Sequence, residues 1–288
     1  MNNKKILIVN ADDFGRHELI NKAVEEGMLH GLIRSATVMV TGKAFDGAVA
    51  LAKKYPQLGM GIHFTLVDGL PVLPPEQIPS LVDPATGRFY PDHGAFVKHF
   101  LKGRVKLSEV RAECQAQLDK FLATGLVPTH ADSHQHMHVL PGIIDVIVDL
   151  CVKAGIPAMR IPAIPVSLTD TRLSNLGEQI GRTGLHVLSE QARRKARRHG
   201  LLTPDYFGGI VAGNAVDTAC IRTILLQMRP GATEIMVHPG TDDAILQADS
   251  HWDHSYTTEL RAVTDPGNVK LTKQLGITAE NFRGLHQL

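Results

Sequence analysis

The sequence predicts an α/β fold, a (β/α) barrel of the TIM type with mostly parallel strands and a helical insertion. Short runs of hydrophobic, β-branched residues alternate along the chain with longer segments of helical periodicity. Six or seven such units within 288 residues favour a closed or nearly closed barrel over an open doubly wound sheet. No glycine-rich dinucleotide-binding sequence follows the first expected strand, which also disfavours the open sheet.

The expected elements begin with a strand over 5–10 (KILIVN) and a helix over 18–32 whose hydrophobic residues share one face. A second unit follows, with a strand over 35–40 and a helix over 45–54. Because most strands precede a helix, they should run parallel, with helices covering the sheet. The later strands are expected at 59–64, at 129–133 before a helix opened by Pro141, at 158–161 and at 233–237.

Two stretches interrupt this repeat within what we expect to be one domain over 1–288. The segment 65–92 is rich in proline and too long for a plain connector, so we expect a binding loop or a lid. The segment 166–204 is polar, and we expect a peripheral helical insertion there. Its basic run RRKARR at 193–198 indicates a solvated helix face; an RNA-binding patch is the weaker alternative, because no aromatic residues interleave with it.

The composition excludes several classes of partner and location. Thirty basic and twenty-nine acidic residues leave a formal charge of +1, which provides no field for holding nucleic acid or an anionic membrane. No hydrophobic run approaches the ~20 residues of a membrane span, and the four at 6–9 are too few for a signal-peptide core. Cys114, Cys151 and Cys220 are odd in number and widely spaced, as is typical of reduced thiols. We therefore expect a cytoplasmic protein.

Polar residues follow the ends of several expected strands. Asp12 and Asp13 follow the first, His63 lies near the end of the third, a histidine cluster over 130–138 follows the fourth, and His238 follows the last. In a parallel barrel the carboxyl ends of all strands meet at one mouth. Residues far apart in the sequence are therefore expected to form one site.

The adjacent carboxylates Asp12 and Asp13 need a partner, because a buried carboxylate is costly unless it is paired, protonated or bound to a cation. In extended backbone their side chains point to opposite faces, so they should serve different partners. One of them could instead cap the following helix, an equally favoured interpretation at this stage. For His63 alone, a satisfied core histidine is the more common outcome.

The cluster THADSHQHMH at 129–138 is harder to explain as core or solvated loop. If this segment is extended, His134, His136 and His138 share one face with His130 and Asp132. Such a polar row needs partners, and a divalent ion with a supporting carboxylate would supply them. The roles of His136 and His138 stay open.

Two further residues end expected strands. His238 precedes a proline that fixes the turn, a position suited to proton transfer. Arg160 also lies beside a proline and could hold a carboxylate through two hydrogen bonds, although a surface ion pair is an equally good interpretation. Tyr206 and Phe207 could stack on a sugar ring or a hydrophobic tail, but such a pair is more often core. The motifs HExxH, GxSxG, GxxxxGK[ST] and CxxC do not occur.

Four motifs occur in order along the chain: NADDFG at 10–15, GIHF at 61–64, THADSHQHMH at 129–138 and VHPG at 237–240. Together they resemble the YdjC-like carbohydrate deacetylases, a group that includes diacetylchitooligosaccharide deacetylase and the hopanoid-biosynthesis-associated deacetylases. The resemblance extends over nearly the whole chain. It implies a distorted (β/α) barrel that removes N-acetyl groups from amino sugars with a divalent metal ion.

Because the motifs match residue by residue, the resemblance also implies roles for individual residues. The metal ligands would be Asp13, His63 and His134; Asp12 would be the general base, His238 the proton donor and Arg160 the residue that steadies the base. Two imidazoles and one carboxylate suit zinc, whereas the family is also associated with magnesium, so the sequence leaves Mg or Zn open. A homodimer is expected from the resemblance alone.

Two other functions remain open. The chain could be a metal-dependent hydrolase of another amide, ester or phosphoester bond, or a non-catalytic carbohydrate-binding barrel. The presence of Asp12, His63, His134 and His238 together disfavours the last. The sequence leaves open whether the substrate is a free sugar, an oligosaccharide or a lipid-linked amino sugar.

Overall fold

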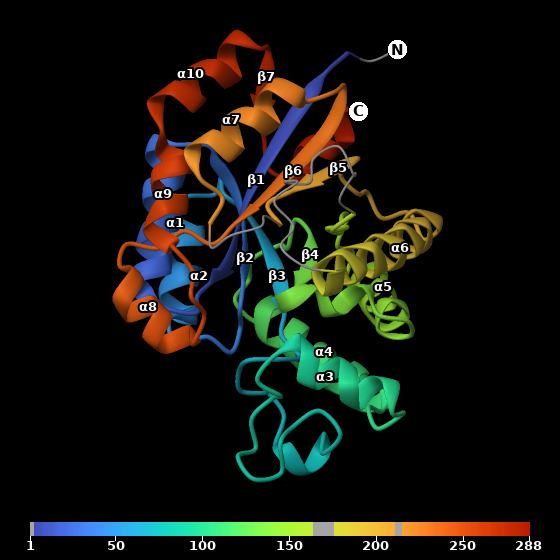
Figure 1. The fold of residues 1–288 in the computed structure, drawn as a ribbon. Coiled ribbons are helices and arrows are strands. Elements are labelled where there is room, and N and C mark those ends of the chain that lie inside the picture. Colours follow the sequence, from blue (N-terminus) through green and yellow to red (C-terminus); the bar gives the residue numbers. More distant parts are fainter. Residues whose placement is uncertain (1–2, 164–175, 211–214) are drawn as a thin grey trace.

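A parallel sheet forms the centre of the computed structural model, which describes residues 3–163, 176–210 and 215–288 (Figure 1). Seven strands are present in these ranges, in the order β4-β3-β2-β1-β6-β5, with β7 also paired to β1. Every strand pairing is parallel, as the alternation of strands and helices predicts. The strands are β1 (Lys5–Phe14), β2 (Ile33–Val38), β3 (Gly59–Phe64), β4 (Ala131–Ser133), β5 (Tyr206–Gly208), β6 (Gly231–Val237) and β7 (Ile277–Ala279).

The sheet curls into a half-barrel, and two isolated bridges extend it beyond β4. Ala131 bridges to Met159, and Ala158 bridges to Leu202, shortly before β5. The strand expected at 158–161 is therefore reduced to these bridges. Prolines stand on both sides of it, at 157 and 162, and a proline has no backbone N–H to donate to a ladder. The predicted class, an α/β barrel of parallel strands, is confirmed.

Helices surround the sheet in two groups of neighbours (Figure 1). One group runs from α2 through α1 and α9 to α7 and α10, and the other runs from α4 through α5 to α6. None of the helices in the described ranges has the length and hydrophobicity that crossing a membrane requires. The helices are α1 (Glu18–His30), α2 (Phe45–Lys54), α3 (His93–Leu101), α4 (Leu107–Leu122), α5 (Ile143–Lys153), α6 (Leu176–Arg198), α7 (Thr218–Gln227), α8 (Asp243–Ser250), α9 (Tyr256–Thr264) and α10 (Pro266–Gln274), with 3-10 helices η1 (Pro75–Gln77), η2 (His134–Val139) and η4 (Phe282–Gln287).

Helix α6 falls inside the expected insertion and packs against α5. Residues 166–175 of that insertion lie outside the described residues, so its boundaries stay a prediction. Three residues of the basic run on α6 form polar contacts with other parts of the protein, so the run is not simply a solvated helix face. Arg193 donates to the backbone carbonyl of Asp205, Lys195 pairs with Asp145, and Arg197 pairs with the Asp205 carboxylate. These contacts tie the end of α6 to its neighbours.

The proline-rich segment 65–92 is irregular as expected, apart from η1 and one antiparallel bridge between Val82 and Phe89. Two glutamates of α4 accept hydrogen bonds from its backbone. The Glu113 carboxylate accepts the backbone N–H groups of Val72 and Leu73 at 2.8 and 3.0 Å, and Glu109 accepts that of Ser80 at 2.7 Å. The segment is thus anchored along its length, while a role in binding stays a prediction.

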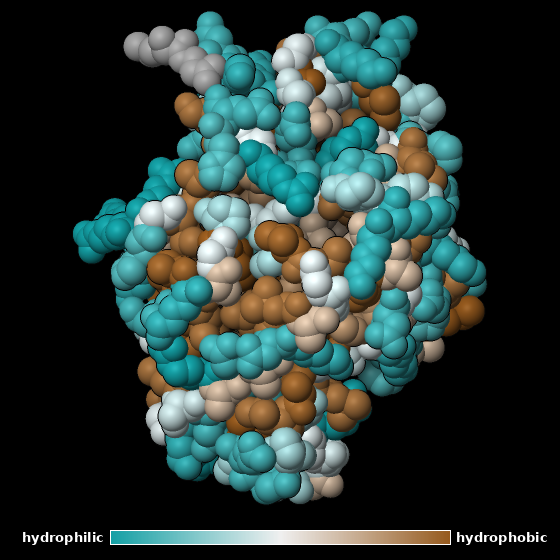
Figure 2. Space-filling model, turned by 180° about the vertical axis from the view of Figure 1, so that it is seen from behind, coloured by the Kyte–Doolittle hydropathy of each residue, from teal (hydrophilic) through white to brown (hydrophobic). Residues whose placement is uncertain are grey.

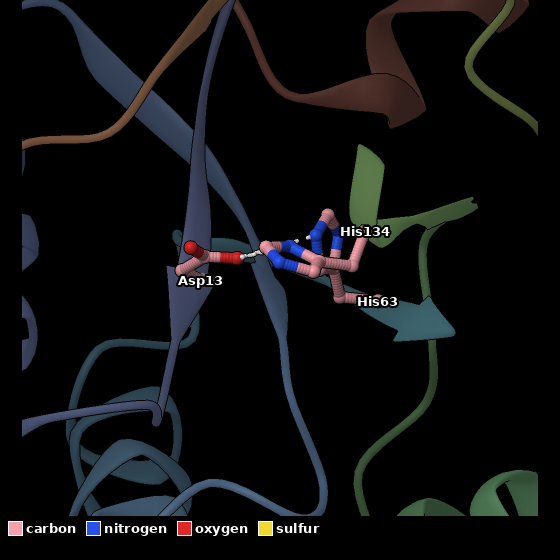
Figure 3. A group of neighbouring side chains, drawn as sticks. All are labelled: Asp13, His63 and His134. Carbon is pink, nitrogen blue, oxygen red and sulfur yellow. Dashed lines mark ion pairs between the residues drawn. The ribbon is translucent and has the colours of Figure 1, made fainter. Parts of the chain in front are cut away.

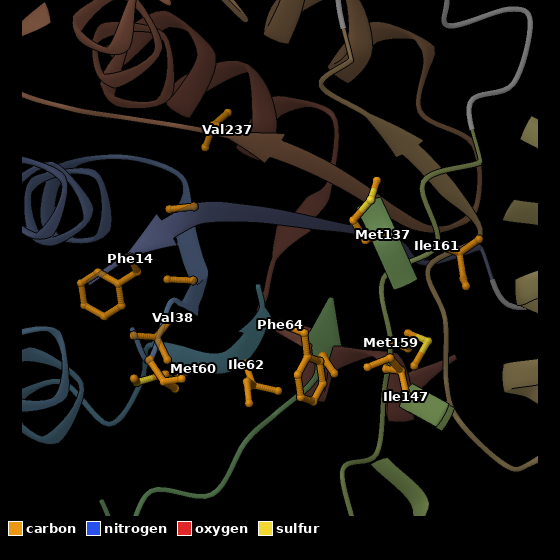
Figure 4. Packing of buried hydrophobic residues seen from close by; sticks show 14 of the residues in the cluster. Phe14, Val38, Met60, Ile62, Phe64, Met137, Ile147, Met159, Ile161 and Val237 are labelled. Atoms are coloured by element: carbon orange, nitrogen blue, oxygen red, sulfur yellow. The ribbon is translucent and has the colours of Figure 1, made fainter. Parts of the chain in front are cut away.

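The core lies between the sheet and its helices (Figure 4). Strand β1 is buried on both faces, as a central parallel strand requires, with Ile6, Leu7, Ile8 and Val9 all buried. It also runs four residues past the expected end at Asn10, so that Asp12 and Asp13 belong to the strand itself. Most of the face shown in Figure 2 is polar, with hydrophobic side chains gathered across its middle.

Gly61 of β3 makes room for a buried ring. A Cβ atom at this position would lie 2.5 Å from Cε1 and 2.6 Å from Nδ1 of His130. The His130 ring cannot easily move, because it stacks on Phe282 with centroids 3.6 Å apart and an interplanar angle of 7°. The glycine of the GIHF motif is therefore required by packing.

We predict that Gly61→Ala lowers the free energy of unfolding by about 1–3 kcal/mol, because the methyl group overpacks the site. Gly184→Ala is the matched control, since a Cβ there meets nothing within 4 Å. Its position within α6 should make it stabilising, by about 0.5–1 kcal/mol. Urea unfolding followed by circular dichroism measures both. Equal stabilities for wild type and Gly61→Ala would contradict the packing argument.

Candidate metal centre

Asp13, His63 and His134 meet at the carboxyl ends of the strands (Figure 3). Oδ1 of Asp13 lies 3.0 Å from Nδ1 of His134 and 3.4 Å from Nε2 of His63. All three side chains are buried, and one potential ligand atom from each lies within 4.8 Å of the others. The structure thus brings together three residues from β1, β3 and the turn after β4.

Backbone conformation separates the two adjacent carboxylates. Asp13 has a φ of 59°, in the left-handed region that aspartate tolerates better than most residues. Asp12 turns to Arg160, whereas Asp13 turns to the two histidines. The expectation of different partners is confirmed, although a left-handed residue replaces the extended backbone assumed for it. The helix-cap alternative is wrong, because the N-cap of α1 is His17, whose Nδ1 accepts the Leu19 N–H at 3.1 Å.

The histidine segment does not form the extended row considered from the sequence. Strand β4 ends at Ser133, and Gln135 and His136 adopt φ values of 50° and 60° inside η2. The Ser133 hydroxyl closes this turn by accepting the backbone N–H of His138 at 2.8 Å. His134, His136 and His138 therefore face different surroundings, and the prediction of a shared face is wrong.

Only His134 of these joins Asp13. The His138 ring lies 2.7 Å from the Ser133 hydroxyl and 3.1 Å from the Arg160 carbonyl, and burial lowers its pKa to about 4. The His136 ring lies edge-on to Phe207 at 5.9 Å. His138 is thus part of the packing beside Arg160, whereas His136 is only half-buried and its Nδ1 has no hydrogen-bond partner.

His130 is likewise a structural residue. Its ring nitrogens lie 2.9 Å from the Thr129 hydroxyl and 3.1 Å from Oδ1 of Asn10. Burial lowers its pKa to about 3, so the ring is neutral. Asn10 in turn donates to Asp12 at 2.9 Å, which links this histidine to the floor of the site.

Arg160 is fully buried, so the surface ion pair considered from the sequence is wrong. Its guanidinium donates twice to Asp12, at 2.5 and 2.6 Å. It also contacts Asp132 at 2.8 Å and donates to Glu234 at 2.6 Å. Burial alone would lower the pKa of Arg160, but these three carboxylates raise it well above its usual value. One cation therefore joins carboxylates from β1, β4 and β6.

Asp132 also orients His63. Its Oδ1 lies 2.6 Å from Nδ1 of that ring, and its Oδ2 accepts a hydrogen bond from Thr37 at 3.1 Å. A carboxylate on one ring nitrogen turns the other toward a ligand position, the usual support of a metal-binding histidine. Burial by itself would lower the pKa of His63, but Asp132 and Asp13 outweigh it and raise the value to about 10.

The polar atoms of the triad are incompletely satisfied within the protein. Oδ1 of Asp13, Nε2 of His63 and Nε2 of His134 are buried and make no hydrogen bond of good geometry, although ion-pair contacts of 3.0–3.4 Å join Asp13 to both rings and His134 to Asp68. Buried polar atoms are normally hydrogen-bonded, so this arrangement favours a shared cation. Two imidazoles and a carboxylate form the three-ligand set that leaves coordination positions open for water or substrate. These residues therefore suit one divalent cation.

Two other groups of side chains are less suited to a cation. Asp12 and Asp132 approach His63, but both carboxylates are already engaged by Arg160. Glu259 lies near His238 and His254, but its two oxygens accept the backbone N–H groups of Val216 and His238. Asp13 with its two histidines is thus the best candidate in the described part of the chain.

His238 stands at the edge of the same site, just after β6. Its Nε2 lies 4.0 Å from Oδ2 of Asp12. Burial lowers the pKa of its ring, against the opposing effect of Asp12 and Asp13. The sequence-derived expectation that strand ends converge is confirmed here, while the chemical role of His238 stays a prediction.

Several residues of the site were not singled out from the sequence. Glu234 lies inside the hydrophobic run of β6, and a carboxylate within a strand expected to be buried was the signal that could have revealed it. Asp68, 3.4 Å from Nε2 of His134 and 2.8 Å from Arg16, comes from the irregular segment and carried no such signal. Phe207 is buried beneath the Arg160 guanidinium, 5.7 Å from it, which confirms the core interpretation of this residue.

Comparisons with known proteins agree with this geometry. The family model described as YdjC-like protein matches residues 6–274. The chain is 31% identical over 282 residues to a carbohydrate deacetylase of Geobacillus stearothermophilus, covering 98% of both chains. It is also 31% identical to a chitooligosaccharide deacetylase of Serratia marcescens, covering 98% of this chain and 100% of that one.

A solved structure shares the fold. The crystal structure of an Enterococcus faecalis V583 protein named for cellobiose-phosphate cleavage superposes with a TM-score of 0.78 and 27% identity. The match covers 98% of this chain and 99% of that chain. The arrangement of strands and helices in the described residues is therefore shared with that protein.

We predict that Arg160→Met lowers the free energy of unfolding by about 3–5 kcal/mol, because it removes the guanidinium that three buried carboxyl groups share. Arg111→Met is the matched control. Arg111 also contacts an aspartate at 2.5 Å, but on the surface, where such pairs contribute at most about 1 kcal/mol. Guanidinium unfolding compares the two, and similar losses would contradict the buried network.

The neutral His130 predicts a pH dependence of stability. Between pH 6.5 and about 3 the unfolded chain protonates this residue and the folded chain does not, so stability falls as the pH falls through this window. Replacement by glutamine removes that proton uptake. The slope of unfolding free energy against pH between about 4.5 and 6 should then decrease by up to about 1.4 kcal/mol per pH unit. An unchanged slope in urea titrations would show that His130 is not the group responsible.

Proposed function

Because the chain belongs to the YdjC-like protein family, we propose that it is a metal-dependent deacetylase that removes the N-acetyl group from amino sugars. The observation that carries this proposal is the buried triad of Asp13, His63 and His134, whose potential ligand atoms lie within 4.8 Å of one another and make no well-formed hydrogen bond at Oδ1 of Asp13 or at Nε2 of either histidine. The named activities of the Geobacillus and Serratia relatives support the substrate class. The reaction adds water across the amide bond and releases acetate and a free amine.

In this proposal Asp13, His63 and His134 hold one divalent cation. When bound, the cation supplies Lewis-acid polarisation of the amide carbonyl and activation of a water molecule. Two imidazoles and one carboxylate favour zinc, although magnesium is the alternative that the family resemblance suggests. Asp132 fixes the His63 ring through its Nδ1, so the ring needs no reorientation on binding.

Asp12 acts as the general base. Its carboxylate accepts two hydrogen bonds from Arg160 and a third from Asn10, and these fix its position beside Asp13, His63 and His134. It takes a proton from the attacking water, while Arg160 supplies the adjacent positive charge and holds the carboxylate in place. Arg160 is thus a positioning residue in the reaction.

His238 acts as the proton donor to the departing amine. Its backbone N–H is held by Glu259, and its Nε2 faces Asp12 across 4.0 Å. Burial lowers the pKa of this ring, which makes the protonated imidazole a stronger acid. The C–N bond then breaks with the nitrogen leaving as an amine, which is a far better leaving group than an amide anion.

We predict that the protein releases acetate from N-acetylglucosamine or its β-1,4 oligomers when zinc or magnesium is present, and not after chelation. Asp12→Asn should reduce kcat by about 10²–10⁴ while the metal content is retained, because only the base is lost. Asp13→Ala should lose the metal as well. Asp46→Asn, an exposed aspartate of α2, is the control with unchanged activity. Acetate assays and elemental analysis measure both properties.

A substrate panel separates this proposal from hydrolysis of another bond. Phosphorylated cellobiose tests the activity for which the Enterococcus protein is named, and acetyl esters test ester cleavage. Acetate from N-acetylated sugars alone supports the deacetylase. Phosphate or cellobiose release without deacetylation would contradict it, and sugar binding without hydrolysis would favour a non-catalytic barrel.

We further propose a cytoplasmic homodimer. Cys114 and Cys151 are buried outside any disulfide, and burial raises the pKa of both thiols, as suits inert cysteines in a reducing compartment. The dimer rests on the family resemblance. Light scattering of the purified protein distinguishes it from a monomer.

A further inference from the structure

Trp252 is the only tryptophan of the chain, and 42% of its surface is exposed. Single exposed hydrophobic residues are common and by themselves indicate nothing. This indole, however, is held in place. It stacks on His254 with ring centroids 3.9 Å apart and an interplanar angle of 18°. His254 is buried, so the stack is anchored in the protein.

The segment between α8 and α9 fixes this stack from the backbone. The Trp252 N–H donates to the Ser250 hydroxyl at 3.2 Å, and the His254 N–H donates to the Trp252 carbonyl at 2.9 Å. Gln247 donates to the His254 carbonyl at 2.9 Å. The indole therefore keeps its orientation without a ligand, which reduces the entropy lost when a ligand binds.

Among the described residues, none of the neighbouring rings covers the indole face that points away from His254. His238 lies perpendicular to both members of the stack, 5.0 Å from Trp252 and 5.4 Å from His254. A ring on the outer indole face would be much farther from His254 than from Trp252. Because His238 is almost equally far from both rings, it lies beside the stack and not on the outer face. Tyr256 lies beside it too, at 6.0 and 4.7 Å. The exposure of Trp252 is thus consistent with an open face turned away from His254.

This position places the indole next to the reacting groups. His238 touches the edge of the stack and faces Asp12 across 4.0 Å. A substrate nitrogen within hydrogen-bond reach of His238 would hold its sugar ring only one covalent bond farther away. The ring that carries the amide, or the ring next to it, therefore comes within reach of Trp252.

We propose that the outer face of Trp252 is a binding platform for a pyranose ring of the substrate. The proposal rests on the proposed deacetylase function. A pyranose presents C–H groups on its face, and the indole face carries the partial negative charge that attracts them. Stacking of this kind binds a sugar through its ring shape and leaves the hydroxyl groups free for other contacts.

Kinetics test the platform. Trp252→Ala should raise KM for the N-acetylglucosamine disaccharide roughly two- to tenfold, with kcat within about twofold, since stacking holds the ring in both ground and transition states. Trp252→Phe should restore most of the affinity. Ile245→Ala removes a similarly exposed side chain from α8, 50% accessible, and should change neither constant. A loss confined to kcat, or an unchanged KM in Trp252→Ala, would overturn the proposal.

Fluorescence tests binding without relying on activity. Because Trp252 is the only tryptophan, its emission reports on this position alone. Titrating the Asp12→Asn protein with the same disaccharide should shift or quench the emission saturably, while cellobiose at equal concentrations serves as the unacetylated comparison. No saturable change with the disaccharide would overturn the platform even if wild type releases acetate. A saturable change in Asp12→Asn, together with no acetate release by the wild-type protein, would leave the platform standing and contradict the deacetylase.

Discussion

The geometry of the site is set by the buried guanidinium of Arg160, which contacts three carboxylates. Asp12, Asp132 and Glu234 come from three different strands, and each contacts the same guanidinium at 2.5–2.8 Å. Removing such charges from water is expensive, and only close contacts of this kind offset the cost. The network therefore fixes the relative positions of β1, β4 and β6 at their carboxyl ends. Arg160 holds the Asp12 carboxylate in its orientation. Arg160 also holds Asp132, and Asp132 in turn orients the His63 ring through a contact with Nδ1 of that ring. The orientation of the candidate ligand His63 therefore depends on Arg160.

The charges of the site favour a divalent ion beside the Arg160 network. Four carboxyl groups of the site are buried, those of Asp12, Asp13, Asp132 and Glu234, and Arg160 contacts three of them. Asp13 lies apart from the guanidinium and has two imidazoles as its close neighbours, with Arg16 3.9 Å away. Burial alone would raise the pKa of Asp13, but His134 outweighs it, and the pKa lies well below the usual value. Asp13 is therefore a buried anion, and the two imidazoles beside it make no well-formed hydrogen bond at Nε2. A divalent ion satisfies all three residues at once.

The sequence predicted the parallel α/β architecture because strand and helix patterns depend on local periodicity, and α2 and β3 have the predicted bounds. It also predicted the convergence of Asp13, His63 and His134, since strand ends meet in such a fold. It failed where single residues adopt left-handed backbone: Asp13 redirects one carboxylate, and Gln135 with His136 breaks the alternating histidine row. It also failed for contacts made across the fold. The burial of Arg160, the part played by Glu234 and the approach of Asp68 all arise from tertiary packing, which periodicity does not encode.

The proposed binding of one divalent cation between Asp13, His63 and His134 can be tested by anomalous diffraction at the zinc absorption edge, on crystals of the wild-type protein grown with zinc. We expect one strong anomalous peak about 2.0–2.2 Å from a carboxylate oxygen of Asp13 and from one nitrogen of each histidine. A peak beside His238, His254 and Glu259 instead, or no peak near the triad at saturating zinc, would contradict it.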